Sequence, residues 1–182
     1  MERLKTRTVY ENNWLKVRED TVLQDGKEAP YGVVERADGA IVIPLAPSGL
    51  TVMLEQARHP TNTRALEFPM GSVNRGEKPE VAARRELFEE CQLRVEALTP
   101  VGMFFPVPAL MAQRAWVYLA RIAEDEIQHA VVADDTDDIV GHRILPLIDI
   151  SALIVSGDIS DGFTLGALAL ALGKGFVSLG SD

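Results

Sequence analysis

Carboxylate side chains at helical spacing dominate the middle of this 182-residue chain. Pro79 suits the first position of a helix, and Glu80 complements the positive charge at a helix N-terminus. These signals predict a helix from about Lys78 to Cys91. At about 100° per residue, one face of this helix carries three carboxylates beside two small residues: Glu86, Glu89, Glu90, Ala82 and Ala83. We therefore expect an acidic and sterically open face, with the opposite face formed by Val81, Phe88 and Cys91.

Such a face needs a positive partner, because like charges at this spacing destabilise a helix by roughly a few tenths of a kcal/mol per pair. The pairs Glu80/Arg84 and Arg85/Glu89 offset only part of that cost. Carboxylate oxygens suit Mg²⁺ or Mn²⁺, and no set of His or Cys residues competes with them. Taken alone, the helix has a second interpretation, which is a solvated acidic surface.

The wider spacing resembles the box of the Nudix hydrolase family. That pattern runs Gly, five residues, Glu, seven residues, then Arg-Glu-aliphatic-x-Glu-Glu-x-Gly-aliphatic. The chain matches it at Gly71, Glu77, Arg85, Glu86, Leu87, Glu89, Glu90 and Leu93. Gln92 stands where the pattern has Gly, which ends the helix in a left-handed conformation that costs another residue roughly 1 kcal/mol.

The resemblance implies an enzyme that hydrolyses a nucleoside diphosphate linked to another group. It assigns metal binding to Glu86 and Glu90 first, with Glu89 beside them and the backbone carbonyl of Met70 as a further ligand. The expected cofactor is Mg²⁺, or Mn²⁺ in its place, because clustered cations neutralise a diphosphate and activate water. We count Arg85 with the catalytic residues, chiefly as a structural partner of Glu77 in an ion pair that braces the loop before the helix.

Two segments upstream are similar to the ADP-ribose pyrophosphatase branch of the family. Glu55-Gln56-Ala57-Arg58 matches a Gln-Tyr-Arg segment, and Glu67-Phe68-Pro69-Met70-Gly71 matches a Glu-Leu-Pro-Ala-Gly segment. The resemblance implies that Arg58 touches substrate phosphate or the box carboxylates, the alternative being a solvated strand end. Glu67 is expected to support that site from behind, or to be an edge-strand carboxylate.

A third segment, Phe104-Phe105-Pro106-Val107-Pro108, resembles the aromatic-Pro-x-Pro segment that follows the box in that branch. Phe105 and Pro108 are therefore candidates for substrate binding, although base rates favour the alternative that Phe105 is a core aromatic. The acidic pair that relatives carry next is replaced here by Ala112-Gln113. The general base is then a box glutamate or an aspartate of the cluster Asp134 to Asp138, which is otherwise a solvated loop.

The composition bounds the remaining function classes. The formal net charge of −9 disfavours binding to nucleic acid or to anionic lipid. Cys91 is the only cysteine, and the first residues lack the apolar run of a signal peptide, so we expect a cytoplasmic protein. The apolar stretch from Leu165 to Leu172 is too short to span a bilayer, which needs about 20 residues.

The elements that position these residues follow from composition and turn signals. An Asp-Gly turn at Asp25-Gly26 predicts a hairpin between Trp14 to Leu23 and Tyr31 to Glu35. Further strands are expected at Ile41 to Leu45, Leu50 to Leu54, Val95 to Leu98, Gly102 to Phe105, Arg114 to Ile122 and His142 to Leu145. Residues Ala123 to Asp138 are expected to form a loop, and closing helices are expected at Ile148 to Val155 and Asp161 to Leu172, with Ser160 or Asp161 as the N-cap of the second.

This order predicts an α/β fold, a Nudix-type α/β/α sandwich with a mixed β-sheet. Residues 1–38 resemble the N-terminal β-region of ADP-ribose and nucleoside-diphosphate-sugar pyrophosphatases, which implies a homodimer, and residues 39–182 form the expected hydrolase domain. The expected substrate is ADP-ribose or a related nucleoside-diphosphate sugar. The alternatives are a housecleaning nucleoside-triphosphate pyrophosphatase and a Nudix-fold sensor that binds nucleotide sugars without cleaving them.

Overall fold

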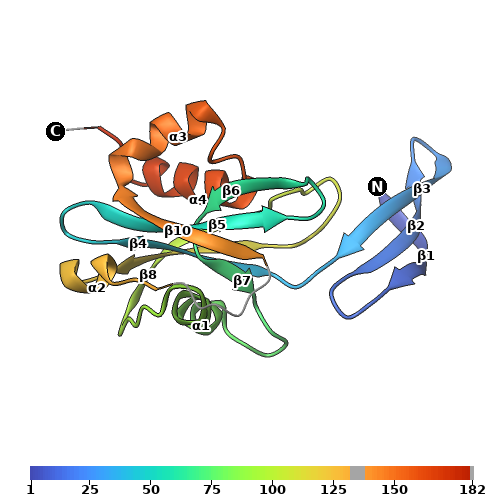
Figure 1. Ribbon diagram of the computed structural model, residues 1–182. Helices are drawn as coiled ribbons and strands as arrows, with labels where there is room; N and C mark the ends of the chain where they lie inside the picture. Colours follow the sequence, from blue (N-terminus) through green and yellow to red (C-terminus); the bar gives the residue numbers. More distant parts are fainter. Residues whose placement is uncertain (132–137, 181–182) are drawn as a thin grey trace.

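The computed structural model describes residues 1–131 and 138–180, which form a layered α/β body with a small sheet projecting from it (Figure 1). The strands of the body lie between α1 on one side and α3 with α4 on the other (Figure 1). The strands are β1 (Glu2–Glu11), β2 (Lys16–Gln24), β3 (Lys27–Glu35), β4 (Gly39–Leu45), β5 (Leu50–Arg58), β6 (Thr63–Glu67), β7 (Met70–Ser72), β8 (Leu98–Phe104), β9 (Ala115–Arg121) and β10 (Ile139–Pro146). The helices are α1 (Pro79–Cys91), α2 (Glu124–Gln128), the 3₁₀ turn η1 (Leu147–Asp149), α3 (Ile150–Ser156) and α4 (Gly162–Gly173). The α/β sandwich expected from the sequence is confirmed.

The body contains two sheets rather than one. The first is mixed, with the order β7-β4-β9-β8 and a parallel pair between β4 and β9, and the second is antiparallel, with the order β10-β5-β6. Strands β4 and β5 follow one another across a short turn but belong to different sheets. Every residue of β4 is buried, as its unbroken apolar run predicts.

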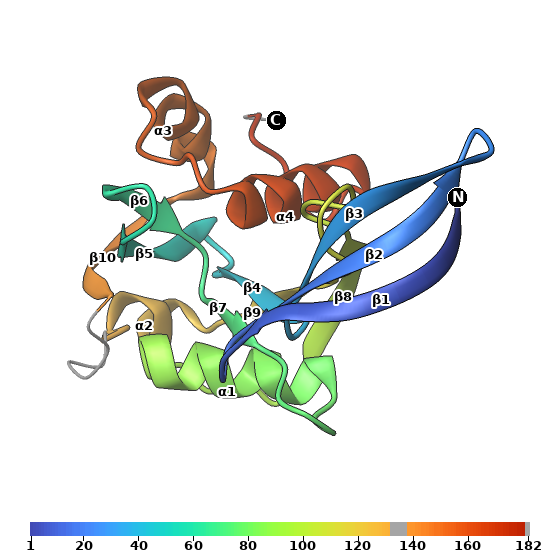
Figure 2. The same cartoon turned by 90° about the vertical axis from the view of Figure 1, so that its right-hand side faces the viewer.

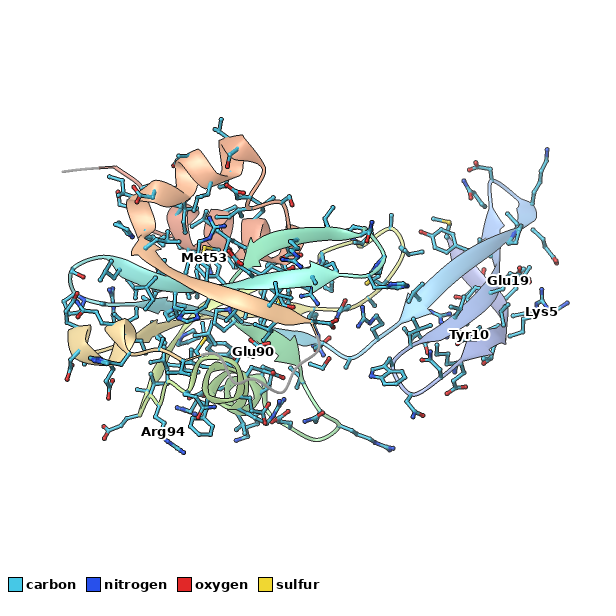
Figure 3. The ribbon with its side chains drawn as sticks, viewed as in Figure 1. Lys5, Tyr10, Glu19, Met53, Glu90 and Arg94 are labelled. Atoms are coloured by element: carbon cyan, nitrogen blue, oxygen red, sulfur yellow. The ribbon has the colours of Figure 1, made fainter. Side chains whose placement is uncertain are left out.

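The core divides between the two helical layers. Ala82, Ala83, Leu87 and Cys91 of α1 pack with the buried residues Ala40, Val42, Val52 and Leu54 of β4 and β5. Leu168 of α4 and Ile150 of α3 pack with Ile41, Ile43 and Met53 on the opposite side. Because neighbouring residues of a strand point to opposite faces, β4 contributes to both halves. Figure 3 shows Met53 on the side of α3 and α4.

The projecting sheet has the order β1-β2-β3, with antiparallel pairing throughout. Its β2–β3 turn places Asp25 and Gly26 at positive φ, 51° and 74°, so the predicted hairpin is confirmed. The prediction missed β1, whose ten residues are all exposed and therefore lack the alternation of buried apolar residues that marks a strand. Figure 1 shows this sheet to one side of the central layers, and in Figure 2 the same sheet lies in front of them.

Two other expectations were wrong in detail. In place of the predicted strands Val95 to Leu98 and Gly102 to Phe105 there is one strand, β8, which begins only at Leu98 and contains Pro100. Proline is tolerated there because β8 is an edge strand and its register shifts between Pro100 and Gly102. The expected loop from Ala123 contains the short helix α2, which buries Ile127 against α1 and its sheet.

Strands β6 and β7 were not predicted, whereas the helices α1, α3 and α4 agree with the sequence. Helix α1 begins at Pro79, and α4 begins after Asp161, whose side chain accepts a hydrogen bond from the backbone N–H of Thr164. Asp161 is therefore the N-cap. Within the residues that the structure describes, no helix is long and apolar enough to cross a membrane.

Candidate functional site

The buried and exposed faces of helix α1 differ from the acidic open face and the opposite apolar face that the sequence predicted. Its buried residues span about half of the helical circumference, from Ala82 to Cys91. Ala82 and Ala83 are fully buried against the strands, so the expected open face is wrong; Cys91 is buried too, whereas Val81 is half exposed. Because burial follows the arc that meets the sheet, the three carboxylates are not equivalent.

Glu86 and Glu90 lie inside the buried arc, whereas Glu89 lies outside it. The Glu86 side chain retains only 12% of its exposure, against 54% for Glu89. Figure 3 shows Glu90 between α1 and the strands above it. The fold therefore separates one exposed carboxylate from two that are held against the body.

Glu86 touches the strand that opens the box. A Cβ atom on Gly71 would overlap the Glu86 carboxyl group, so only glycine allows this approach of β7 to α1. Burial raises the pKa of Glu86, and hydrogen bonding to Arg85 only partly opposes that rise. The box therefore requires glycine at position 71 because any side chain there would collide with the Glu86 carboxylate.

Glu90 is anchored to the same strand. The backbone N–H of Met70 donates to Glu90 Oε2 at 2.9 Å. Burial, reinforced by the negative charge of Glu86, raises the pKa of Glu90 to about 8. Two carboxylates are therefore held close together in a partly desolvated place, where their mutual repulsion is not fully compensated.

Arg85 braces the box around this pair. Its guanidinium donates to Glu77 at 3.1 and 3.2 Å, to Glu86 at 2.7 Å and to Glu89 at 2.9 Å. It also donates to the Ser72 carbonyl at 2.9 Å, which ties the helix to the end of β7. The hydrogen bond from Arg85, followed by one from the Asn74 backbone, lowers the pKa of Glu77. The ion pair expected between Glu77 and Arg85 is present and links the loop to the helix.

The departure from the box pattern at Gln92 leaves the turn intact. Gln92 has φ 56° and ψ 19°, the left-handed conformation in which glycine ends the helices of the pattern. Its backbone N–H and its side-chain Nε2 both donate to the Phe88 carbonyl, at 2.9 and 3.1 Å. The helix therefore ends where the pattern requires, with the strain of a non-glycine residue at that position.

A second charged group lies at the corner between β5 and β6. Arg58 Nε and Nη2 donate to the two carboxylate oxygens of Glu67, at 2.9 and 2.5 Å. Glu67 is only 1% exposed, and burial raises its pKa although Arg58 opposes the rise. The charges of Arg58 and Glu67 both act on the pKa of Glu90, so the corner adjoins the carboxylate pair.

A cavity of about 430 Å³ connects these two groups. Met70 and Gly71, which touch Glu90 and Glu86, line it on one side, and Arg58 lines it as well. The sequence reasoning gave no site role to most of its other lining residues, among them Arg36, Gln113, Asp161 and Phe163. No local pattern marks them, because they come from the linker after β3, the approach to β9 and the start of α4.

Hydrogen bonds explain how two of these distant segments reach the cavity. Gln113 Nε2 donates to the Ala37 carbonyl at 2.7 Å, which fixes the linker beside the approach to β9. The backbone N–H of Phe68 donates to Thr164 Oγ1 at 3.2 Å, which fixes the start of α4 beside Glu67. The cavity is therefore a product of long-range contacts.

Phe105 and Pro108 lie elsewhere. They line a separate apolar hollow of about 270 Å³ together with Tyr31 and Val33 of β3. Phe105 is 48% exposed, so the reading as a core aromatic is wrong. The structure brings these two residues to the projecting sheet and not to the cavity beside Glu90.

The late acidic cluster is described only at its end, since Asp134, Asp135 and Asp137 lie outside the described residues. The Asp138 carbonyl accepts a hydrogen bond from the Ala57 N–H at 2.7 Å, and its carboxylate contributes to the raised pKa of Arg58. Asp138 therefore adjoins the corner formed by Arg58.

The donor set at the box fits a magnesium ion that is shared with a substrate. Within residues 1–131 and 138–180, no three acidic, histidine or cysteine side chains converge as a closed metal site. Glu86 and Glu90 are two carboxylates that repel one another, and Gly71, which has no side chain, leaves room for the Glu86 carboxylate. Mg²⁺ is commonly held by one or two carboxylates together with substrate phosphates and water, so the set fits this ion.

Comparison with known proteins agrees with this geometry. The NUDIX domain model matches residues 35–160, and the model of the nucleoside diphosphate sugar hydrolase N-terminal domain matches residues 1–34. The chain is 29% identical over 150 residues to an ADP-ribose pyrophosphatase of Bacillus subtilis (strain 168), covering 82% of this chain and 80% of that one. It is 34% identical over 94 residues to an ADP-sugar pyrophosphatase of Mus musculus, covering 45% and 43%.

A solved structure, described as the crystal structure of ADP compounds hydrolase, superposes with a TM-score of 0.78. It covers 96% of both chains at 19% identity, and it therefore supports the fold alone. The box on α1, the layered body and the match over residues 35–160 lead to one conclusion: the chain belongs to the NUDIX domain family and carries the N-terminal domain of nucleoside diphosphate sugar hydrolases.

Proposed function

We propose that this protein is a Mg²⁺-dependent pyrophosphatase that hydrolyses ADP-ribose or a related nucleoside-diphosphate sugar. The observation that carries the proposal is the carboxylate pair Glu86 and Glu90, held through Met70 and Gly71 against a cavity that Arg58 also lines. The N-terminal domain match and the relative from B. subtilis support the substrate class. Water attacks one phosphorus, the anhydride bond to the other phosphate breaks, and a nucleoside monophosphate and a sugar phosphate leave.

The box residues divide the work. Glu86 and Glu90 hold the cation, with the Met70 carbonyl as a further ligand, while Glu89 is oriented by Arg85 at the exposed edge of the same helix. The bound Mg²⁺ supplies neutralisation of the diphosphate and activation of the attacking water. Arg85 keeps β7, the loop and α1 in register, so it acts on the reaction through the residues it positions.

Arg58 binds the phosphates from the opposite side. Its side chain is 41% exposed although Glu67 holds two of its nitrogens, so its remaining donors can reach an anion. Because Glu67 is buried and fixed by β6, it sets the plane of the guanidinium before substrate arrives. Binding of a diphosphate then requires little reordering of a long side chain.

The general base is either a box glutamate or an aspartate of the cluster Asp134 to Asp138. The candidate box glutamates are the exposed Glu89 and the buried pair Glu86 and Glu90. Asp138, the described member of the cluster, adjoins Arg58 and supports the second choice. Proton transfer by such a group contributes roughly 10²- to 10⁴-fold to a rate.

We also propose that residues 1–38 form a dimerisation region and residues 39–182 the hydrolase domain. The projecting sheet exposes large apolar side chains that a partner could cover, including Val9, Tyr10 and Trp14 at 56%, 55% and 75% exposure. Light scattering at micromolar concentration tests this: the expected mass is twice 19.9 kDa, and an active monomer contradicts it.

A substrate panel tests the reaction. ADP-ribose, several nucleotide sugars and ATP are incubated with Mg²⁺, and phosphate is measured after coupling to a phosphatase that acts only on monoesters. Hydrolysis of a nucleotide sugar that stops in EDTA supports the proposal. A preference for ATP would favour a triphosphate pyrophosphatase, and flat traces with tight nucleotide-sugar binding would favour a sensor.

A further inference from the structure

Asp38 ends the linker that joins the projecting sheet to β4, and its carboxylate binds the segment that opens β9 (Figure 1). Asp38 Oδ1 accepts a hydrogen bond from the Arg114 backbone N–H at 3.0 Å, and Oδ2 accepts one from Arg114 Nε at 2.8 Å. Oδ2 also accepts one from Trp116 Nε1 at 3.2 Å. We name Asp38, Arg114 and Trp116 the Asp38 clamp, because one carboxylate joins the linker to residues 76 and 78 positions later.

The backbone of Asp38 reaches the strand of the box. Its carbonyl accepts a hydrogen bond from the Val73 N–H at 2.8 Å, immediately after β7. Among the described strands, β7 is the edge of its sheet and pairs with β4 alone. The pairs are Gly39 with Ser72, Ala40 with Gly71 and Ile41 with Met70. The bond from Val73 to Asp38 therefore extends a ladder of three pairs, and the position of its acceptor is fixed by the clamp.

Strand β7 in turn holds the charged residues of the box. The Met70 N–H donates to Glu90, Gly71 makes room for the Glu86 carboxylate, and the Ser72 carbonyl accepts from Arg85. All three contacts depend on the distance between β7 and α1. A shift of this short strand would consequently move the whole set together.

The clamp is better placed to fix geometry than to stabilise the fold. The Asp38 side chain is 19% exposed and the Arg114 side chain 49%, and ion pairs with such access to water add little to stability. In contrast, three donors on one carboxylate fix its orientation and with it the start of β4. The gain from the clamp is therefore chiefly in the alignment of β4, β7 and β9.

We propose that Asp38 is a positioning residue of the proposed reaction, which keeps β7 at the distance from α1 that Glu86, Glu90 and the Met70 carbonyl need to hold a cation. The inference rests on the proposed function for the reaction, but cation binding is measurable without turnover. Arg58 belongs to β5, in the other sheet of the body. Loosening β7 therefore leaves the phosphate-binding guanidinium in place, so the clamp acts on the cation and on kcat rather than on KM.

Asp38→Ala tests the proposal, because it removes the three side-chain hydrogen bonds and keeps the backbone bond to Val73. Calorimetric titration of the full chain with Mg²⁺ measures cation affinity, and kinetics on ADP-ribose at saturating Mg²⁺ gives kcat and KM. Groups that orient metal ligands contribute about 10- to 100-fold to metal affinity or activity, and a misplacement of about 1 Å costs up to about 100-fold in rate. We expect Mg²⁺ affinity to fall about tenfold and kcat to fall about 10- to 100-fold, with KM near the wild-type value.

Glu124→Ala is the matched control at the opposite end of β4. The Glu124 carboxylate accepts hydrogen bonds from Ser48 Oγ at 2.7 Å and from the Ser48 N–H at 3.3 Å, again across 76 residues. These bonds tie the turn after β4 to α2 and lie outside the cavity beside the box. This variant should lose about as much in a thermal melt as Asp38→Ala does, while keeping its Mg²⁺ affinity and kcat.

Asp38→Asn is a second, milder variant, which decides the question if Asp38→Ala does not fold. Asparagine keeps the size and one acceptor oxygen, but its NH₂ group cannot accept from Arg114 or Trp116. Its Mg²⁺ affinity and kcat should fall between those of wild type and Asp38→Ala. Wild-type values in both Asp38 variants, an equal loss in Glu124→Ala, or a rise in KM as large as the fall in kcat overturns the proposal.

The same measurements separate this inference from the proposed reaction. If the wild-type chain hydrolyses nucleotide sugars and both Asp38 variants match it in Mg²⁺ affinity and kcat, the inference fails and the reaction stands. If the wild-type chain cleaves no nucleotide sugar but the Asp38 variants bind Mg²⁺ more weakly than Glu124→Ala does, the reaction fails and the positioning role of Asp38 stands.

Discussion

Two charged groups adjoin the cavity, and they balance charge in different ways. The box cluster around α1 sets Glu77, Glu86, Glu89 and Glu90 against a single Arg85. The corner at β5 and β6 pairs Arg58 with Glu67 through two hydrogen bonds. The first group has an excess of negative charge, whereas the second is neutral within itself.

The difference distinguishes carboxylates that a cation would complete from a carboxylate that is already paired. A buried charge persists only if it is paired or if a ligand completes it. Glu67 is paired, so its burial serves to orient Arg58. Burial and the nearby charge of Glu86 raise the pKa of Glu90 to about 8, although the hydrogen bond from the Met70 backbone opposes the rise. A bound cation would neutralise this pair of carboxylates.

The largest effect should come from Glu90. Glu90→Gln keeps the shape and removes the charge, and we expect kcat to fall by orders of magnitude with the fold intact. Glu89→Gln is the matched control one position away on the exposed arc, and its fall should be smaller. Steady-state kinetics with circular dichroism checks the pair. Equal losses would mean that burial does not distinguish the two carboxylates, and a near wild-type Glu90→Gln enzyme would rule out the metal site.

The next effect concerns the corner. Arg58→Lys keeps the charge but loses the planar fork, so kcat/KM should drop by about 10- to 100-fold. Glu67→Gln should produce part of the same loss by freeing Arg58, and in that variant Mg²⁺ affinity should change less than KM. Arg64→Lys, on the same β6 strand but outside the cavity, is the control. Should Arg58→Lys match the wild type, the corner would be structural only.

The stability of the metal-free protein should depend on pH through Glu90. Its folded pKa of about 8 lies above the ordinary 4.5, so the folded state holds this proton more tightly than the unfolded state does. That contribution to stability is complete below about pH 4.5 and is lost as the pH rises through about 8. Thermal melts in EDTA from about pH 5.5 to 8.5 should therefore decline more for wild type than for Glu90→Gln. Added Mg²⁺ should raise Tm most at the alkaline end, because the ion binds the ionised pair; a Mg²⁺ effect that is independent of pH would contradict this.

The smallest effect should come from the end of α1. Gln92→Gly relieves the left-handed strain and should raise the free energy of unfolding by up to about 1 kcal/mol, with kcat unchanged. The gain is limited, because the bond from Gln92 Nε2 to Phe88 is lost and glycine adds entropy to the unfolded chain. Gln24→Gly, at the end of β2 with an ordinary φ, should lose stability instead. Urea denaturation of both variants decides this, and a destabilised Gln92→Gly would show that the side-chain bond matters more than the strain.

Local sequence determined the parts of the molecule whose signals are short in range. Pro79 and the spacing of the carboxylates placed α1, Asp25-Gly26 placed a hairpin turn, and the apolar run of β4 marked a fully buried strand. These features depend on backbone preferences and on the period of burial, which neighbouring residues carry among themselves. The match to the Nudix box then supplied the fold and the candidate residues of the proposed metal site.

Tertiary structure alone decided which of those residues are equivalent and what surrounds them. The arc of α1 that meets the strands separates Glu89 from Glu86 and Glu90, and a helical wheel cannot show where the sheet lies. Phe163 and Asp161 reach the cavity because α4 is fixed to Phe68 across 96 residues of sequence. Phe105 is directed to the projecting sheet by contacts of β3 with the segment after β8, among them the bond from Tyr31 to the Ala109 carbonyl. Such contacts are set by packing between distant segments, and no spacing within either segment encodes them.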